Sequence, residues 1–380
     1  MSTKKSPVER HLYSINLNGQ NMVALTDQNV DGYYGVSFSP LAQYYQLTYR
    51  GPDIPHQSVL STWNSSFRLD LEDNQSLQET LKKFDLPNSV YGTLKIDGYT
   101  LNYREIRPPN FDDSGKTKYP VLFNCYGGPM SQTVEKRFLI DWHTWLTSEP
   151  RLEYVVVQFD GRGTGFMGRK TRVSVRGQLG VLESADQAAA AEYFTYPSLA
   201  NDRHWKQRNY VNPEKMALWG WSFGGFLTLK TIESHPGAFP YAMAVAPVTD
   251  WRFYDSIYTE RYMLTPHDNP FGYRNSAILN TTAMSEAKRF FIAHGTGDDN
   301  VHIQNSLALM DKLTENGIVN WDSQVYTDDD HSIVFHNGHR AVYWRLAEWL
   351  ERWFGRKEPG TRTWRVDGEL LGYKEGVDGD

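Results

Sequence analysis

The sequence has almost no cysteine, and this scarcity excludes a disulfide-stabilised fold. Cys125 is the single cysteine among 380 residues, so no intrachain disulfide can form. Paired cysteines and the HExxH motif are also lacking, and the histidines are scattered, so we expect neither a metal nor a cofactor. The stretch DGRGTG at residues 160–165 is similar to a dinucleotide-binding loop, but Phe166 stands where that motif requires its third glycine.

A large excess of charge and a long hydrophobic run are also lacking. The net charge is −6 and is spread along the chain, which argues against nucleic acid or an anionic membrane surface as a partner. No apolar run approaches the ~18 residues of a membrane span, and MSTKKSPVER has no apolar signal core. We therefore expect the chain as written to be soluble. Asn64, Asn74 and Asn280 begin N-x-S/T sequons, which permit glycosylation in a secretory lumen.

Hydrophobic residues make up 40% of the chain, enough for a substantial core in one large domain and a smaller one. The first ninety or so residues predict short β-strands, with turns at Asn18-Gly19 and Ser39-Pro40. Four such strands suit about one blade of a β-propeller, or a small orphan sheet with open edges. We place a domain boundary near Leu86, which gives domains at residues 1–85 and 86–354 and a flexible charged tail at 355–380.

Beyond Tyr119, short apolar runs alternate with helical stretches. Near-continuous apolar strands separated by helices predict an α/β protein with a largely parallel, doubly wound sheet. Strands are predicted at residues 121–126, 154–159, 215–221, 241–248, 289–295 and 321–327. Helices are predicted at residues 183–194, 225–234, 303–316 and 339–354.

The pattern Gly220-Trp221-Ser222-Phe223-Gly224 lies between a predicted strand and a predicted helix. G-x-S-x-G in that context is typical of a nucleophile elbow, where a sharp turn exposes a reactive serine. The alternative is a glycine-rich connection with a bystander serine. The strand and helix on either side favour the elbow.

A serine nucleophile needs a base and an orienting acid, which in this kind of fold follow in the order serine, acid, histidine. Asp298 and Asp299 follow the strand at 289–295, and His331 and His336 follow the strand at 321–327. We select Asp298 and His331. Taken singly, each has an ordinary alternative, an acidic turn or a surface histidine.

Two further groups could complete an acyl-transfer site. The backbone N–H of Phe223 and a donor from the loop at residues 124–132, such as the phenol of Tyr126, suit an oxyanion hole. Trp251, Tyr254 and Tyr258 are spaced i, i+3, i+7, which predicts one face of a helix. This aromatic stripe suits either a pocket for a proline ring or ordinary core packing, and the spacing does not decide between them.

Six segments resemble the dipeptidyl peptidase IV branch of the prolyl oligopeptidase family. The segments are YPVLFNCYGGPMSQ, DGRGTGFMGRK, WGWSFGGF, APVTDWRFYDSIYTERYM, HGTGDDNVHIQNS and DDDHSIVFHN. Two stretches, HGTGDDNVHIQNSLALMDKL and DHSIVFHN, most resemble the membrane-anchored fungal aminopeptidases of the vacuole and late Golgi. The resemblance implies an α/β-hydrolase fold with a remnant of an N-terminal β-propeller. It also implies release of N-terminal dipeptides from peptides with proline or alanine in second position.

The resemblance assigns a role to each matching residue. Ser222 is the nucleophile, Asp298 and His331 complete the charge relay, and Tyr126 donates to the oxyanion. The proline pocket and its neighbours are Val248, Trp251, Tyr254, Tyr258 and Val301 with Phe223 beside them, and Asn300 contacts the substrate carbonyl.

Two departures from the family pattern affect the expectation. The family usually has tyrosine where Phe223 stands. We expect this difference to matter little, because the oxyanion hole uses the backbone N–H of this residue and not its side chain. Family members also carry a membrane anchor and a full propeller, whose acidic pair grips the substrate amine. Here only about the last blade is present, no residue is assigned to that pair, and the chain resembles an N-terminally truncated form.

Three functions therefore stay open. They are a dipeptide-releasing serine exopeptidase, a hydrolase-fold protein with only a binding or assembly role, and an esterase or acylaminoacyl peptidase. The resemblance implies the vacuolar membrane or late Golgi lumen as the location, and it leaves a homodimer open.

Overall fold

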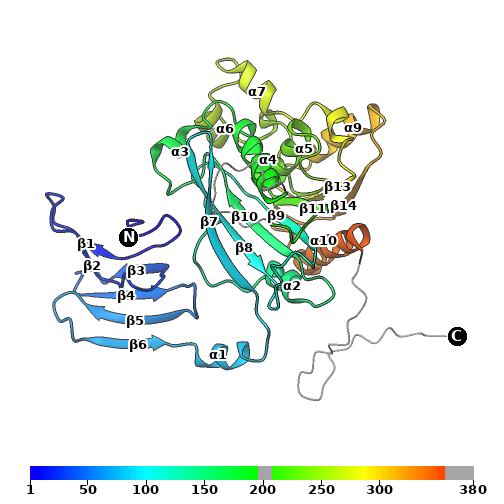
Figure 1. Ribbon diagram of the computed structural model, residues 1–380. Helices are drawn as coiled ribbons and strands as arrows, with labels where there is room; N and C mark the ends of the chain where they lie inside the picture. The colour runs from blue at the N-terminus through cyan, green and yellow to red at the C-terminus, as the bar shows by residue number, and fades with distance from the viewer. Residues whose placement is uncertain (196–207, 356–380) are drawn as a thin grey trace.

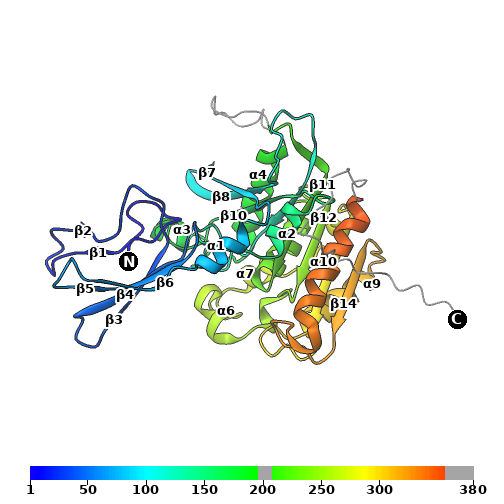
Figure 2. The same cartoon turned by 90° about the horizontal axis from the view of Figure 1, so that it is seen from below.

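The computed structural model of the protein describes residues 1–195 and 208–355, so the tail predicted at 355–380 lies, apart from its first residue, outside the described residues. The described chain forms two larger sheets and one small hairpin. In both views the four-stranded sheet lies to one side of the eight-stranded sheet (Figures 1 and 2). The change from one sheet to the other falls between residues 72 and 88.

The N-terminal part contains the predicted hairpin and more strands than predicted. Strands β1 (Tyr13–Ser14) and β2 (Val23–Ala24) pair antiparallel around the Asn18-Gly19 turn, as expected. A four-stranded antiparallel sheet follows, in the order β3 (Tyr34–Phe38), β4 (Tyr44–Tyr49), β5 (His56–Ser61), β6 (Arg68–Glu72). Strands β5 and β6 and helix α1 (Gln75–Leu81) were missed because they carry little hydrophobic pattern. Every residue of β6 is exposed.

The eight-stranded sheet has the order β14-β13-β12-β11-β9-β10-β8-β7. Its central strands pair in parallel, whereas β7 and β8 form an antiparallel hairpin at one edge. The prediction of a mostly parallel sheet is confirmed. The bounds are β7 (Asn88–Ile96), β8 (Tyr99–Arg107), β9 (Tyr119–Asn124), β10 (Val155–Asp160), β11 (Val211–Trp221), β12 (Tyr241–Val245), β13 (Arg289–Gly295) and β14 (Trp321–Tyr326).

Helices cover both faces of this sheet, and the four predicted helices correspond to α4, α5, α9 and α10 (Figure 1). The bounds are α2 (Trp142–Ser148), α3 (Arg169–Val173), α4 (Val181–Thr195), α5 (Phe223–Ser234), η2 (Trp251–Phe253), α6 (Ser256–Met263), α7 (Pro270–Ser276), α8 (Thr281–Met284), α9 (Gln304–Glu315), η3 (Phe335–Asn337) and α10 (Gly338–Phe354).

Two hydrophobic clusters form because alternate residues of each strand point to opposite faces. On β13, Phe290 and Ile292 pack into the cluster that holds α4, α5 and α9, whereas Phe291 and Ala293 pack into the cluster with α2 and α10. Each face of the sheet is therefore covered by its own hydrophobic core. The polar residues of the site lie beyond the carboxyl ends of the strands, where such sheets bind their ligands.

The N-terminal part is joined to the larger sheet through residues 132–138. The phenol of Tyr33 donates to Glu135 at 2.7 Å, and Lys136 Nζ lies 3.1 Å from Glu9 Oε1. Burial opposes the charge of Glu9, but its hydrogen bonds to His11, Lys5 and Lys136 lower its pKa to about 2. The N-terminal residues therefore hold the segment that follows the predicted oxyanion loop. Across residues 1–195 and 208–355, no helix is both long and apolar enough to cross a membrane.

Candidate active site

The serine motif forms a sharp turn between β11 and α5. Ser222 has φ 61° and ψ −119°, a left-handed conformation that is costly for a residue other than glycine. A Cβ atom on Gly220 would lie 2.4 Å from the backbone of Gly224, and one on Gly224 would lie 2.3 Å from the Cys125 carbonyl oxygen. Only glycine fits at either position. The Ser222 side chain does not cap α5, so the helix does not use its hydroxyl.

Asp298 and His331 meet at the same edge of the sheet. His331 Nδ1 lies 2.7 Å from Asp298 Oδ2, whereas the alternatives Asp299 and His336 are exposed. Asp298 is buried, and its Oδ1 accepts hydrogen bonds from the backbone N–H groups of Asn300 and Val301.

The charge of Asp298 is well stabilised. Burial raises the pKa of Asp298, but hydrogen bonds from His294 and His331 outweigh burial and hold it well below its usual range. The carboxylate therefore stays ionised and accepts from His331 Nδ1, which leaves Nε2 as the nitrogen that can take a proton.

Trp221 ties the histidine loop to the elbow. Its indole Nε1–H donates to the backbone carbonyl of His331 at 2.9 Å. Trp221 directly precedes Ser222, so this bond brings the two loops together.

The predicted oxyanion donors lie near the serine. Phe223 begins α5, where backbone N–H groups have no partner within the helix. Tyr126 follows β9 and directly precedes Gly127, whose φ of +80° suits glycine. The ring centroid of Tyr126 lies 6.2 Å from the ring centroid of Phe223. Desolvation raises the pKa of Tyr126, so its phenol keeps its proton and can donate.

The aromatic stripe is not one helix, so that part of the prediction was wrong. Trp251 begins η2, Tyr254 is extended, and Tyr258 lies in the separate helix α6. The rings nevertheless meet: Trp251 stacks on Tyr258 at 5.9 Å, and Tyr254 meets Tyr258 edge-on at 5.4 Å. The break between the helices brings Tyr254 and Tyr258 together at a right angle.

The predicted pocket residues divide by burial. Val248, Val301 and Trp251 are almost fully buried, as core residues would be. Tyr254 and Tyr258 are half-buried and face outward enough to meet a ligand. Burial raises the pKa of Tyr254 to about 12, so it too stays protonated.

The Tyr254 phenol donates to Asn300 Oδ1 at 2.7 Å. This bond uses the carbonyl oxygen of the amide, so the Asn300 Nδ2–H2 group is the part left to donate to a ligand.

Sequence reasoning missed several polar residues around this site. His294 is buried and lies 3.2 Å from Asp298, Trp221 holds His331, and Asp160 accepts backbone hydrogen bonds from Thr133 and Val134 near the oxyanion loop. The partners of Trp221 and Asp160 are distant in sequence, so no local spacing could reveal them. His294 lies four residues before Asp298, but it ends a strand and Asp298 follows in a loop, so this spacing does not by itself indicate a contact. The only signal for His294 was a polar residue at the end of an apolar strand.

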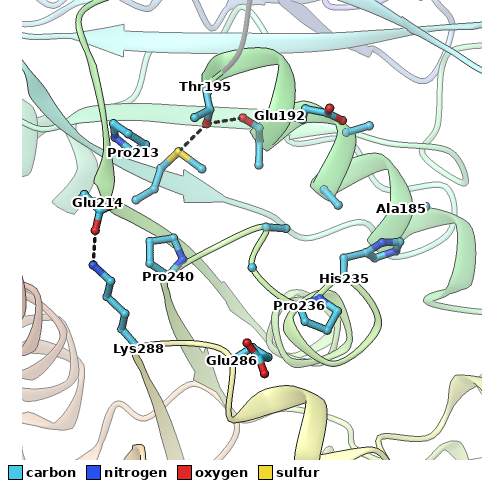
Figure 3. A pocket seen from close by; sticks show the side chains of 16 residues that line it. Ala185, Glu192, Thr195, Pro213, Glu214, His235, Pro236, Pro240, Glu286 and Lys288 are labelled. Carbon is cyan, nitrogen blue, oxygen red and sulfur yellow. Dashed lines mark hydrogen bonds and ion pairs between the residues drawn. The ribbon is translucent and has the colours of Figure 1, made fainter. Parts of the chain in front are cut away.

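A pocket of about 700 Å³ lies elsewhere and shares no residue with the candidate site. It opens between α4, the start of β11 and the end of α5, where Glu214 pairs with Lys288 (Figure 3). This is the end of the sheet opposite to Ser222, because β11 starts beside the pocket and ends at the elbow. No cluster of three or more metal-ligating side chains occurs among the residues that the structure describes.

A strand–serine–helix elbow on a doubly wound, mostly parallel sheet defines an α/β hydrolase. A family model described as the prolyl oligopeptidase family matches residues 142–357, which is more than half of the chain. A second model, described as the dipeptidyl peptidase IV N-terminal region, matches residues 1–56. The chain belongs to the prolyl oligopeptidase family.

Individual relatives agree with this assignment. The chain is 50% identical over 353 residues to a probable dipeptidyl-aminopeptidase B of Neurospora crassa, covering 92% of this chain and 37% of that protein. It is 52% identical over 357 residues to a probable dipeptidyl-aminopeptidase B of Tuber melanosporum, covering 93% of this chain and 38% of that protein. The chain thus spans a little over a third of the length of these curated relatives.

A solved structure matches over the same extent. The crystal structure of Porphyromonas gingivalis dipeptidyl peptidase 4 superposes with a TM-score of 0.81 at 36% sequence identity, and the match covers 92% of this chain and 47% of that one.

Proposed function

We propose that this chain is the catalytic part of a serine dipeptidyl aminopeptidase that releases N-terminal Xaa-Pro or Xaa-Ala dipeptides. The observation that carries the proposal is the Asp298–His331 pair, whose side chains are 2.7 Å apart and whose histidine accepts, through its backbone carbonyl, a hydrogen bond from Trp221, the residue before Ser222. The similarity to dipeptidyl-aminopeptidases from two fungi supports the same reaction class.

In the proposed mechanism Ser222 Oγ attacks the carbonyl carbon of the second substrate residue, and His331 Nε2 takes the hydroxyl proton. Asp298 accepts from Nδ1–H throughout and stabilises the imidazolium that forms. The departing amine receives the proton from His331, which leaves an acyl-enzyme ester on Ser222. Water, deprotonated by His331, then releases the dipeptide and restores the serine.

The negative oxygen of each tetrahedral intermediate needs donors placed in advance. We assign the Phe223 N–H and the Tyr126 phenol to this role. Backbone geometry supports the assignment, because Phe223 begins α5 and Tyr126 precedes a glycine with φ +80° in the loop after β9.

Substrate preference is assigned to the aromatic group. Tyr254 and Tyr258 stand at 90° to each other over buried Trp251, a corner that suits the flat, compact ring of proline or the methyl of alanine. Val248 and Val301 belong to the same buried cluster as Trp251, and Tyr254 and Tyr258 pack against that cluster. We assign the Nδ2–H2 group of Asn300 to hold a substrate carbonyl oxygen, because the Tyr254 phenol engages its Oδ1 and not this group.

A substrate panel tests the proposal. The chain is incubated with Ala-Pro and Ala-Ala amides, their N-acetylated forms and a simple activated ester, with Ser222→Ala as the control. Release of an intact dipeptide, detected by mass spectrometry and lost in Ser222→Ala, supports the proposal. Ester hydrolysis without dipeptide release from any amide favours an esterase, and no Ser222-dependent turnover favours a binding role.

Location and assembly are proposals that rest on resemblance. We infer a vacuolar or late Golgi location, and the exposed sequon residues Asn64 and Asn280 fit glycosylation there. A homodimer is tested by the mass of the native protein.

A further inference from the structure

A buried histidine lies behind the partly exposed histidine of the proposed charge relay. His294 is the penultimate residue of β13 and is only 1% exposed. Its Nε2 lies 2.7 Å from the Val301 carbonyl oxygen and 3.2 Å from Asp298 Oδ2, and its Nδ1 lies 2.7 Å from the Ser306 hydroxyl. Both ring nitrogens are therefore engaged.

The contacts determine which nitrogen carries hydrogen. A carbonyl oxygen and a carboxylate oxygen are both acceptors, so Nε2 must be the N–H that serves them. The Ser306 hydroxyl can donate to Nδ1, so the neutral ring satisfies all of its partners.

These contacts form a closed hydrogen-bond network with the loop at residues 298–301. Asp298 Oδ1 accepts from Asn300 N and Val301 N at 3.0 and 2.8 Å, and Val301 returns a carbonyl to His294. Asp298 Oδ2 meets His331 on one side and His294 on the other. The carboxylate is thus held at both oxygens, and its rotation would disrupt all four of these contacts.

We propose that His294 is a positioning residue that fixes the Asp298 carboxylate and the Asn300–Val301 turn as one unit. The inference rests on the proposed function, and it assigns to one imidazole the joint alignment of the charge relay and of two substrate-contacting residues. A histidine that only filled the core would need a single acceptor for its buried N–H, whereas Nε2 of His294 lies near two, the Val301 carbonyl and the Asp298 carboxylate.

The arrangement has a measurable electrostatic consequence. The titratable groups that face Asp298 are His331 and His294, with Tyr254 at longer range. Removing the Nε2–H donor leaves more of the carboxylate charge to act on His331, which favours its imidazolium form. The proton NMR titration of His331 should therefore move to higher pH in a variant that lacks this donor.

The test compares His294→Met with His294→Gln in the full chain. Methionine fills the space without a donor, whereas the glutamine amide can reach the position of Nε2. The pKa of His331 is measured by proton NMR titration of its imidazole, which requires no substrate. The rate at which an organophosphonate labels Ser222 is measured in parallel over the same pH range.

The control is His143→Gln. His143 is also buried and also bonded to a carboxylate, with its Nδ1 2.9 Å from Asp141 Oδ2, but it lies in α2 and its Nε2 accepts from Trp219 Nε1, so neither contact involves the Asp298 loop. The His143→Gln variant should have a lower unfolding temperature than the wild type, but its His331 should titrate as in the wild type.

We expect His294→Met to raise the pKa of His331 and to slow labelling by roughly tenfold or more, because sub-ångström misplacement of a catalytic group is costly. We expect His294→Gln to keep most of the wild-type titration of His331 and most of the wild-type labelling rate of Ser222. If His294→Met does not fold, His294→Asn serves instead, since its shorter amide faces Ser306 and not Asp298.

An unchanged His331 titration in folded His294→Met or His294→Asn would overturn the inference, as would an equal shift in His143→Gln. Failure of the proposed function would appear differently, as a wild-type chain whose His331 titrates but whose Ser222 is neither labelled nor active.

Discussion

Adding one methyl group to Gly224 should separate the activity of the elbow from its stability. The Cβ of Gly224→Ala would lie 2.3 Å from the Cys125 carbonyl oxygen, and real contacts of this kind are at least 3.0 Å, so about 0.7 Å of movement is required. Overpacking of this kind costs roughly 1–3 kcal/mol, while alanine in a helix returns about 1 kcal/mol relative to glycine. The net loss of stability should be only about 0–2 kcal/mol.

The loss of activity should be far larger. The movement displaces either Ser222 or Cys125, and Cys125 directly precedes Tyr126, so nucleophile and oxyanion donor separate. Misplacement of about this size can lower a rate by roughly 10²-fold. The assay is the rate of phosphonate labelling of Ser222 beside the thermal unfolding temperature.

Gly317→Ala is the matched control. Gly317 has φ +68° with no atom near its missing Cβ, so alanine there costs about 1–2 kcal/mol of strain without touching the site. It should lose similar stability and label at the wild-type rate. Wild-type labelling by Gly224→Ala would refute the elbow geometry.

Three further changes have defined outcomes. Tyr126→Phe should lower kcat by roughly 10²–10³ with little change in KM, and an unchanged kcat would place the second donor at a backbone N–H of the same loop. Tyr258→Ala should cost several-fold more kcat/KM with proline than with alanine substrates, because the ring loses more contact area, and equal losses would mean core packing. Burial raises the pKa of Glu183 to about 8, above its ordinary 4.5, so its carboxyl destabilises the fold increasingly as pH rises between these values. Glu183→Gln should therefore raise the unfolding temperature by ~5 °C at pH 8 but not at pH 4, and an equal effect at both would contradict the raised pKa.

Much of the larger sheet could be predicted because its signals are local. The strand at residues 289–295 is a continuous apolar run, and its observed bounds are the predicted ones. The elbow was predictable for a related reason: its glycines and serine are adjacent in sequence, so their spacing records the geometry directly.

The misses share a physical cause. Strand β6 is exposed along its whole length, so it has no buried face that would require apolar residues at every second position. Trp251 and Tyr258 share a spacing that fits one helix, but Asp250 and Asp255 cap two separate helices there. Local periodicity cannot reveal such a break.

The contacts around Asp298 could not be predicted from the sequence for a different reason. His294 meets Ser306, and Trp221 meets His331, through pairings that only the assembled sheet creates. Residue type alone distinguishes neither from a core residue.

The most direct test of the central claim is to locate the covalent adduct. The folded chain is treated with an organophosphonate, digested and mapped by mass spectrometry, beside Ser222→Ala, His331→Ala and Asp298→Asn. We predict one adduct, on Ser222, that is absent in Ser222→Ala and forms at least about a hundredfold more slowly in the other two variants. An adduct on another serine, or wild-type labelling without His331, would contradict the assignment.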